Sequence, residues 1–233
     1  MSRRVVSLVP SLTEAVASVG ADLLVGATDW CSHPTDLDVA RIGGTKNPRV
    51  GQIVALRPDV VLANSEENRV PDLQALREAG VDVWLTGFET VPEALSGLAE
   101  MLRSLGLGSP DWLEAAWESW RQPWERPRLR GLVPIWRRPW MALGRDTFAG
   151  DVLSRVGLDN VLMSDPERYP KIDLTALPPY DVVVLPDEPY AFSAADGPEC
   201  FQVPAALVSG RHLTWYGPSL AQARAVLEHS LWG

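Results

Sequence analysis

The chain has 233 residues, a formal net charge of −9 and a pI of about 4.9, and 46% of its residues are hydrophobic. This acidic balance, without a long run of Lys or Arg, argues against nucleic acid or an anionic membrane surface as the main partner. No segment approaches the roughly 18 consecutive apolar residues of a membrane span, so we expect no membrane insertion.

The N-terminus superficially matches a secretory signal, because two arginines precede apolar residues. Polar residues and Pro10 interrupt that apolar stretch, so we predict no export signal and, on this criterion, a cytoplasmic location. The two cysteines, Cys31 and Cys200, lie far apart in the sequence and predict no disulfide framework.

The first half of the chain alternates between strand and helix patterns. Expected strands cover residues 4–8, 23–25, 60–63 and 81–85; expected helices cover 11–19, 71–79 and 92–105, with a short helix ending at Leu56. Ser11 is expected to cap the first helix, with Glu14 three residues later as in a capping box. This alternation predicts an α/β fold with a mostly parallel sheet and helices on both faces.

A tryptophan-rich segment follows, from Ser109 to Pro127. Its tryptophans recur near helical spacing, which predicts a helix with one apolar face. We expect these rings to pack into cores rather than to stack on a ligand. The predicted organisation is an N-terminal lobe (1–107), a connecting helix (108–127) and a C-terminal lobe (128–233).

The second half restarts the alternation. We expect strands at 129–136, 140–143, 181–185 and 206–208, a helix from Asp146 or Thr147 to Val156, and a final helix at 218–231. The sequence VGAD after the first helix has a counterpart, VGLD, after the helix that ends at Val156. The two halves therefore predict two related, Rossmann-like lobes joined by a single helix.

In open α/β sheets, ligands bind beyond the carboxyl ends of the strands. The loops at those ends should face one cleft between the lobes. The candidate ligand-binding residues there are Pro10, Ser11, Trp30, Cys31, His33, Lys46, Asn64, Glu66, Glu67, Phe88, Trp140, Arg145, Asp187, Glu188, Tyr190, Trp215 and Tyr216.

Cys31 and His33 have side chains that bind zinc and other transition metals. A closed zinc site needs four ligands and a catalytic site three plus water, so this pair alone is incomplete. A loop-stabilising role for the His33 ring is the favoured interpretation.

Paired acids from both halves, Glu66 with Glu67 and Asp187 with Glu188, suit acid–base chemistry or a hard cation. They equally suit solvated loop charges, and both interpretations stay open. Lys46, which follows two glycines, could hold an anionic group, although the spacing is not that of a phosphate-binding P-loop.

Arg145 could bind an anion at a helix start or pair with a neighbouring aspartate. The aromatic candidates could form flat walls around a large planar ligand. No nucleophile elbow, HExxH motif or dinucleotide fingerprint is present.

Four segments resemble the periplasmic-binding-protein-like, helical-backbone metal receptor superfamily. They are RVVSLVPSLTEAVASVGADLLVGATDW, IVALRPDVVLA, MALGRDTFAGDVLSRVGLDNVL and LPPYDVVVLPDEPY. The nearest branch is the cobalamin-binding type of ABC-transporter substrate-binding protein. The resemblance implies two α/β lobes, a rigid connecting helix and a ligand held between the lobes by the loops named above.

The resemblance also implies an ABC-transporter permease as partner, although Gly51 and Gln52 stand where the first docking glutamate is expected and Asp173 matches the second only approximately. The leading hypothesis is a receptor for a cobalamin-like or iron-chelate (siderophore-like) small molecule, extracytoplasmic if the family role is retained. The alternatives are a cytosolic enzyme or carrier that uses Cys31, His33 and the acids, and a binder of a free divalent metal.

Overall fold

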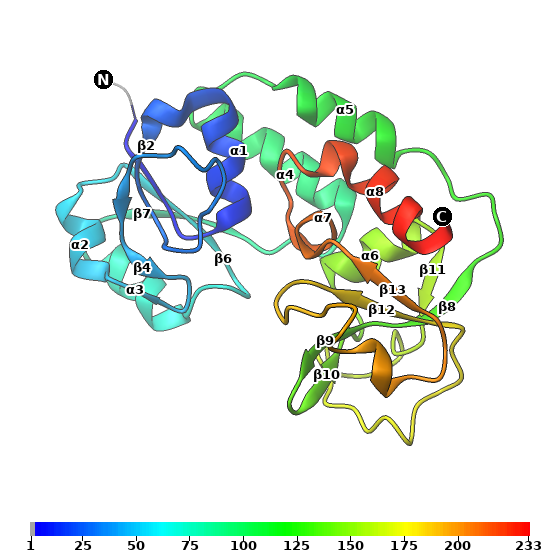
Figure 1. Ribbon diagram of the computed structural model, residues 1–233. Coiled ribbons are helices and arrows are strands. Elements are labelled where there is room, and N and C mark those ends of the chain that lie inside the picture. The colour runs from blue at the N-terminus through cyan, green and yellow to red at the C-terminus, as the bar shows by residue number, and fades with distance from the viewer. Residues whose placement is uncertain (1–2) are drawn as a thin grey trace. The chain divides into compact units, whose positions relative to one another are not determined.

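The computed structural model describes residues 3–233 and divides into two compact units (Figure 1). Unit 1 holds the described residues up to Gly87, with Leu95–Glu114 and Tyr216–Pro218; unit 2 holds Phe88–Ala94, Ala115–Trp215 and Ser219–Gly233. Within residues 3–233, no helix is long and apolar enough to cross a membrane. The expected α/β architecture with parallel sheets in two lobes is confirmed.

Unit 1 is built on a five-stranded sheet in the order β3-β2-β1-β6-β7, and every neighbouring pair is parallel. The strands are β1 (Val5–Ser7), β2 (Leu24–Ala27), β3 (Ala40–Arg41), β6 (Val60–Asn64) and β7 (Asp82–Thr86). The helices of unit 1 are α1 (Pro10–Gly20), α2 (Val50–Ala55) and α3 (Val70–Glu78), while α4 (Val91–Ser104) and α5 (Asp111–Trp120) each have residues in both units. A small antiparallel pair, β4 (Gly43–Gly44) and β5 (Asn47–Pro48), follows β3.

The core of unit 1 explains why β6 reads as an unbroken apolar run. All five of its residues are buried, as expected for a parallel strand covered on both faces. On one face, Val61 and Ala63 pack in a cluster with Ile53 of α2 and Leu76 of α3. Figure 1 shows α2 and α3 side by side over this part of the sheet.

Unit 2 contains a four-stranded parallel sheet in the order β11-β8-β12-β13. Its strands are β8 (Leu129–Leu132), β11 (Leu158–Asn160), β12 (Val182–Pro186) and β13 (Ala205–Val208), and an antiparallel hairpin joins β9 (Pro134–Arg137) to β10 (Trp140–Ala142). The helices are α6 (Phe148–Arg155), α7 (Gly210–Thr214) and α8 (Leu220–Trp232), and two short 3-10 turns, Ala21–Leu23 in unit 1 and Pro198–Cys200 here, complete the chain.

Helix ends both confirm and correct the sequence predictions. Thr147 caps α6, since its hydroxyl accepts a 3.2 Å hydrogen bond from the Gly150 amide. Gly157 ends that helix at φ +88°, and a Cβ there would lie 2.2 Å from Trp124. Ser11 is not the cap of α1: the helix begins at Pro10, after Val9, without a side-chain cap, and Ser11 is buried in the first turn.

The tryptophan-rich helix is shorter than the predicted 108–127 connector. α5 ends at Trp120, and the boundary between the two units falls within it, after Glu114. Its buried indole, Trp120, donates a 2.8 Å hydrogen bond to the Leu220 carbonyl, which fits the expected core role. The predicted strand 129–136 is also interrupted, because Val133 separates β8 from β9.

Candidate functional site

The loop after β2 presents an exposed tryptophan at the carboxyl edge of unit 1. The Trp30 side chain is 68% exposed. The guanidinium of Arg41 holds the loop from within, because it donates to the carbonyls of Thr28 (3.1 Å), Cys31 (2.9 Å) and Leu37 (3.2 Å). The loop is therefore braced while its indole faces solvent.

Gly44 allows the Trp30 indole to lie close to the β4–β5 hairpin. A Cβ at Gly44 would stand 3.3 Å from Trp30 Nε1 and 2.7 Å from Asn47 Oδ1. A larger residue would push the indole or the Asn47 amide away. From sequence, the glycines were expected to allow close backbone approach to an anion held by Lys46, which stays a prediction; in the structure, Gly44 lies against the Trp30 indole.

Cys31 turns into the interior of unit 1 and is only 1% exposed. Its sulfur lies 3.0 Å from the Thr13 hydroxyl and 3.1 Å from the Thr28 hydroxyl. The expectation that Cys31 rims a ligand pocket is therefore wrong for this conformation: the thiol fastens the loop to α1.

The metal interpretation of Cys31 and His33 gains no support. His33 is half-buried and its Nδ1 lies 3.1 Å from the Ser32 hydroxyl. Among residues 3–233, no group of three His, Cys, Asp or Glu side chains is placed to hold a metal ion.

Asn64 and Tyr216, both candidates from sequence, meet inside unit 1. Asn64 Nδ2 donates a 2.6 Å hydrogen bond to the Tyr216 hydroxyl, which also lies 3.4 Å from the Thr86 hydroxyl. Asn64 Oδ1 accepts from the backbone amides of Glu66 (2.8 Å) and Glu67 (3.0 Å). Burial raises the pKa of the Tyr216 phenol well above its ordinary value.

The buried positions of Asn64 and Tyr216 place them beneath the surface turn that carries Glu66 and Glu67. They support that turn rather than line it. Lys46 reaches the same turn from the β4–β5 hairpin, where its ammonium donates to the Glu66 carbonyl. Asn68 ties the hairpin further, through a 3.0 Å hydrogen bond to the Thr45 carbonyl.

In unit 2, two candidates follow β12. Asp187 Oδ1 accepts a 2.6 Å hydrogen bond from the Gly210 amide, at the start of α7. Glu188 Oε2 accepts a 3.0 Å hydrogen bond from the Trp215 indole, and the Arg211 guanidinium lies 5.5 Å from the Trp215 ring centre. The indole of Trp215 is thus oriented by a carboxylate and a cation.

Trp140 and Tyr190, expected as flat walls for a ligand, are half-buried and pack on other aromatic rings of unit 2. Trp140 stacks on buried Phe192, with ring centres 6.0 Å apart and planes 6° apart, and meets Phe201 edge-on at 5.5 Å. Tyr190 packs against Phe192 at 4.6 Å and donates a 2.6 Å hydrogen bond to Asp196. Both rings are partly buried and pack against a core cluster of unit 2, so part of each ring serves the core, and ligand contact by the two rings stays a prediction.

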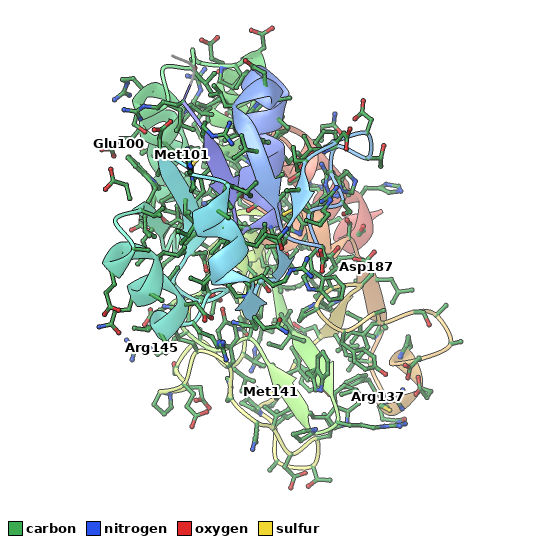
Figure 2. The ribbon with its side chains drawn as sticks, turned by 90° about the vertical axis from the view of Figure 1, so that its left-hand side faces the viewer. Glu100, Met101, Arg137, Met141, Arg145 and Asp187 are labelled. Atoms are coloured by element: carbon green, nitrogen blue, oxygen red, sulfur yellow. The ribbon has the colours of Figure 1, made fainter. Side chains whose placement is uncertain are left out.

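The remaining candidates lie apart from these groups. Arg145 is exposed and pairs with Asp146 at 2.5 Å, as one of the sequence interpretations held. Figure 2 shows it well apart from Asp187, and shows Arg137 and Met141 in the region of the β9–β10 hairpin. Phe88 is half-buried just before α4, and Pro10 opens α1.

Sequence reasoning missed three residues that shape these sites: Arg41, Thr86 and Arg211. Arg41 and Arg211 carry no motif, and their roles depend on loops that are distant in the sequence. Thr86 ends β7, and its position after a predicted strand was the one available signal.

No family model matches the chain. Similar curated proteins include the vitamin B12-binding proteins of Vibrio cholerae serotype O1 (22% identical over 185 residues, 74% of this chain and 66% of that protein) and Pectobacterium carotovorum (23% over 187 residues, with the same coverage). The match thus spans just under two thirds of those relatives. An ABC transporter substrate-binding lipoprotein of Bacillus subtilis, YvrC, is 32% identical over 84 residues, 35% of this chain and 27% of that protein.

Solved structures share the fold over nearly the whole chain. A periplasmic haem-binding protein from Pseudomonas aeruginosa has a TM-score of 0.76 at 25% identity and covers 100% of this chain and 93% of that one. The periplasmic vitamin B12-binding protein BtuF of Vibrio cholerae has a TM-score of 0.72 at 17% identity, over 98% and 96%. The resemblance of this chain to the helical-backbone metal receptor superfamily, predicted from four sequence segments, is thereby confirmed.

Proposed function

We propose that this protein is a substrate-binding-protein-like receptor for a metal-containing or macrocyclic small molecule, of the cobalamin or iron-chelate class. The proposal is supported by curated relatives named for vitamin B12 and by structural neighbours named for haem and vitamin B12. The observation in this chain that carries it is the exposed Trp30 indole on a braced loop at the carboxyl edge of unit 1.

A large planar or macrocyclic ligand gains affinity when a rigid aromatic ring covers one of its faces. The loop of Trp30 is already held by Arg41 and by the buried thiol of Cys31, so little ordering remains to be done on binding. We propose that the Trp30 indole contacts ligand and that Glu66 and Glu67, which are also in unit 1, face its polar rim.

We further propose binding without turnover, since the relatives are named as binding proteins. An ABC-transporter permease is the proposed partner, by analogy with YvrC, and an extracytoplasmic location is proposed from the periplasmic relatives. The cytoplasmic expectation drew only on the N-terminal residues and gains no support from these relatives. For the alternative of a free-metal binder, no group of three His, Cys, Asp or Glu side chains among residues 3–233 is placed to hold a metal ion.

Calorimetric titration with cyanocobalamin, haem and a ferric siderophore tests the proposal. We expect saturable, one-to-one binding of one of them, weakened about tenfold or more by Trp30→Ala. Trp117→Ala, which removes a 39% exposed indole from α5, is the matched control and should leave affinity unchanged. Absence of binding to all three ligands, or equal affinity of the wild type and Trp30→Ala, would overturn it.

A further inference from the structure

β7 is the terminal strand of the unit 1 sheet (Figure 1). It pairs with β6 along its whole length, from Asp82 opposite Val60 to Thr86 opposite Asn64. Within residues 3–233, no strand pairs with its other edge. An open strand edge is a row of backbone donors and acceptors that can template pairing with another chain.

The backbone pattern identifies which residues face outward. The Thr86 carbonyl accepts a 2.9 Å hydrogen bond from the Ser65 amide, so the peptide groups of Thr86 face β6. In a parallel ladder the bonded residues alternate, so Trp84 and Asp82 also face β6. The N–H and C=O groups of Val83 and Leu85 therefore point away from the sheet.

The side chains of β7 do not protect that edge. Leu85 is 45% exposed, and Val83 and Trp84 are half-buried. Natural edge strands are usually guarded by lysine, proline or a bulge. The sequence of β7, DVWLT, has none of these, and its single charge lies at its first residue.

We propose that β7 pairs antiparallel with β7 of a second copy of this chain, about a two-fold axis at Trp84. In that register Val83 lies opposite Leu85 of the second copy, and Leu85 lies opposite Val83 of the second copy. Both residues present outward N–H and C=O groups, so each of the two pairs exchanges two hydrogen bonds. The two Trp84 residues face each other at the close, non-hydrogen-bonded position, where aromatic pairs stabilise a sheet.

Repulsion between the two Asp82 carboxylates favours this register over its neighbours. With the axis at Trp84, each Asp82 lies opposite a Thr86, and the two Asp82 residues are separated by four residues, about 13 Å along the strands. An axis at Val83 would halve that separation and bring the carboxylates toward each other. The resulting interface is isologous, so it closes at a dimer instead of growing into a filament.

Sedimentation analysis of the purified full chain across a range of concentrations tests the proposal. We expect a reversible shift from the 25.5 kDa monomer toward twice that mass. Leu85→Lys should weaken dimerisation at least about tenfold, because a charge on an edge strand opposes pairing. Leu207→Lys is the matched control, since Leu207 is 40% exposed on β13, the terminal strand of the unit 2 sheet, and it should dimerise as the wild type does.

A cross-linking experiment reports the register. Trp84→Cys in a Cys200→Ser background should form an intermolecular disulfide under mild oxidation, because Cα atoms at a facing non-hydrogen-bonded pair are about 4.5 Å apart. Asp82→Cys in the same background should not, since its opposite residue is Thr86. A monomer at all concentrations, or a dimer that Leu207→Lys disrupts and Leu85→Lys does not, overturns the proposal. This result is independent of ligand binding.

Discussion

The side-chain amide of Asn64 donates a 2.6 Å hydrogen bond to the hydroxyl of Tyr216, which lies 152 residues later in the chain. Both residues are buried, and Tyr216 belongs to the short segment Tyr216–Pro218 that unit 1 includes. Asn64 uses its other side-chain atom to hold the amides of Glu66 and Glu67. One phenol therefore supports the turn that follows β6.

Tyr216→Phe is expected to lower the free energy of unfolding by about 1–3 kcal/mol, because the buried Asn64 amide loses its 2.6 Å acceptor and keeps only the Thr86 hydroxyl at 3.4 Å. Amide exchange at Glu66 and Glu67 should become faster, since Asn64 is then free to change rotamer. Tyr180→Phe provides the control, because Tyr180 is half-buried and should change stability little. Urea unfolding and hydrogen exchange measure both effects, and equal stability of the two variants would contradict the role assigned to Tyr216.

Stability should fall at high pH through the same phenol. Burial raises the pKa of Tyr216 in the folded chain above its ordinary value of 10.0, so between these values the unfolded chain has lost a proton that the folded chain retains. The free energy of unfolding should therefore be insensitive to this group below pH 10 and decrease above it, by at most about 1.4 kcal/mol per pH unit.

Urea unfolding of the wild type and Tyr216→Phe between neutral pH and pH 11 measures this contribution. The slope above pH 10 should be smaller in Tyr216→Phe. Tyr180→Phe should keep most of the wild-type slope, although burial also raises the pKa of Tyr180. Identical slopes for the wild type and Tyr216→Phe would show that the phenol is not buried in solution.

The long elements of the fold were predictable because their burial leaves a sequence pattern. β6 and β12 are covered on both faces and appear as apolar runs, predicted at 60–63 and 181–185 and observed at Val60–Asn64 and Val182–Pro186. The two-residue strands β3, β4 and β5 and the five-residue α7 left no such pattern. Pairing with distant segments forms them, and a local sequence window does not contain that information.

The positions of the candidate residues at strand ends were predictable, but the directions of their side chains were not. Asn64 is the last residue of β6, and Glu188 follows the end of β12. Whether a residue in such a loop points outward depends on its partners: Trp30 is exposed over Gly44, whereas Cys31, the next residue, is buried between two threonine hydroxyls. Trp140 turned inward because Phe192 and Phe201 offer it stacking partners.

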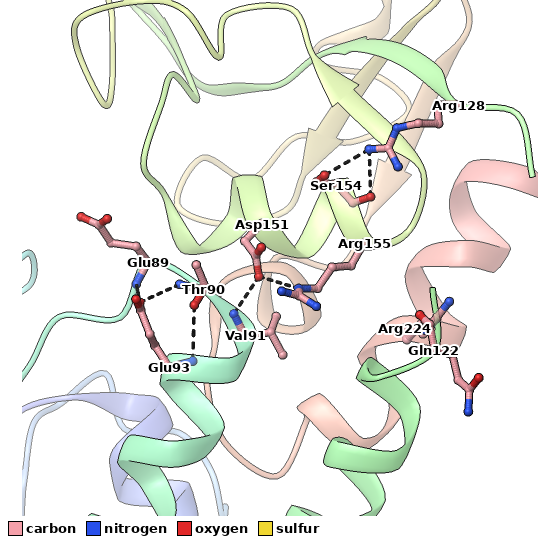
Figure 3. Close-up of polar contacts among 10 residues, drawn as sticks. All are labelled: Glu89, Thr90, Val91, Glu93, Gln122, Arg128, Asp151, Ser154, Arg155 and Arg224. Carbon is pink, nitrogen blue, oxygen red and sulfur yellow. Dashed lines mark hydrogen bonds and ion pairs between the residues drawn. The ribbon is translucent and has the colours of Figure 1, made fainter. Parts of the chain in front are cut away.

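Asp151 anchors the start of α4. Its carboxylate accepts 2.7 Å hydrogen bonds from the Val91 amide and from the Arg155 guanidinium, as Figure 3 shows. Asp151→Ala should destabilise the protein by about 0.5–2 kcal/mol, since a helix amide loses its cap and a negative charge near the positive end of the helix is removed.

Asp151→Asn should cost less than Asp151→Ala, because the amide oxygen still accepts the bond while the charge is lost. Ser154→Ala, on the same helix, removes only a 3.1 Å contact with the Arg128 guanidinium and serves as control. Thermal unfolding ranks the three variants. If the Asp151→Ala variant were as stable as the Ser154→Ala variant, the Asp151 carboxylate would not cap α4.

Arg41 is expected to hold the Trp30 loop in its binding conformation. Arg41→Ala removes three donors to loop carbonyls, so amide exchange over residues 28–37 should accelerate. Ligand affinity should fall several-fold, because binding would then have to order the loop. Arg77→Ala on α3 is the control for removing a surface cation. Faster exchange without any change in affinity would separate the loop from the proposed ligand site.

The two cysteines should differ in reactivity toward a thiol reagent such as DTNB. Cys31 is 1% exposed and lies between the Thr13 and Thr28 hydroxyls, so it should react only when the protein unfolds. Cys200 is partly exposed, so the reagent can reach its sulfur, which also accepts a 3.3 Å hydrogen bond from the Arg137 guanidinium. The native wild type should therefore release one equivalent of thionitrobenzoate and the denatured protein two.

The Cys200→Ser variant is the control: it should release no thionitrobenzoate when native and one equivalent when denatured. Rapid native labelling of that variant would show that the loop around Cys31 opens, and the thiol would then return as a candidate ligand contact.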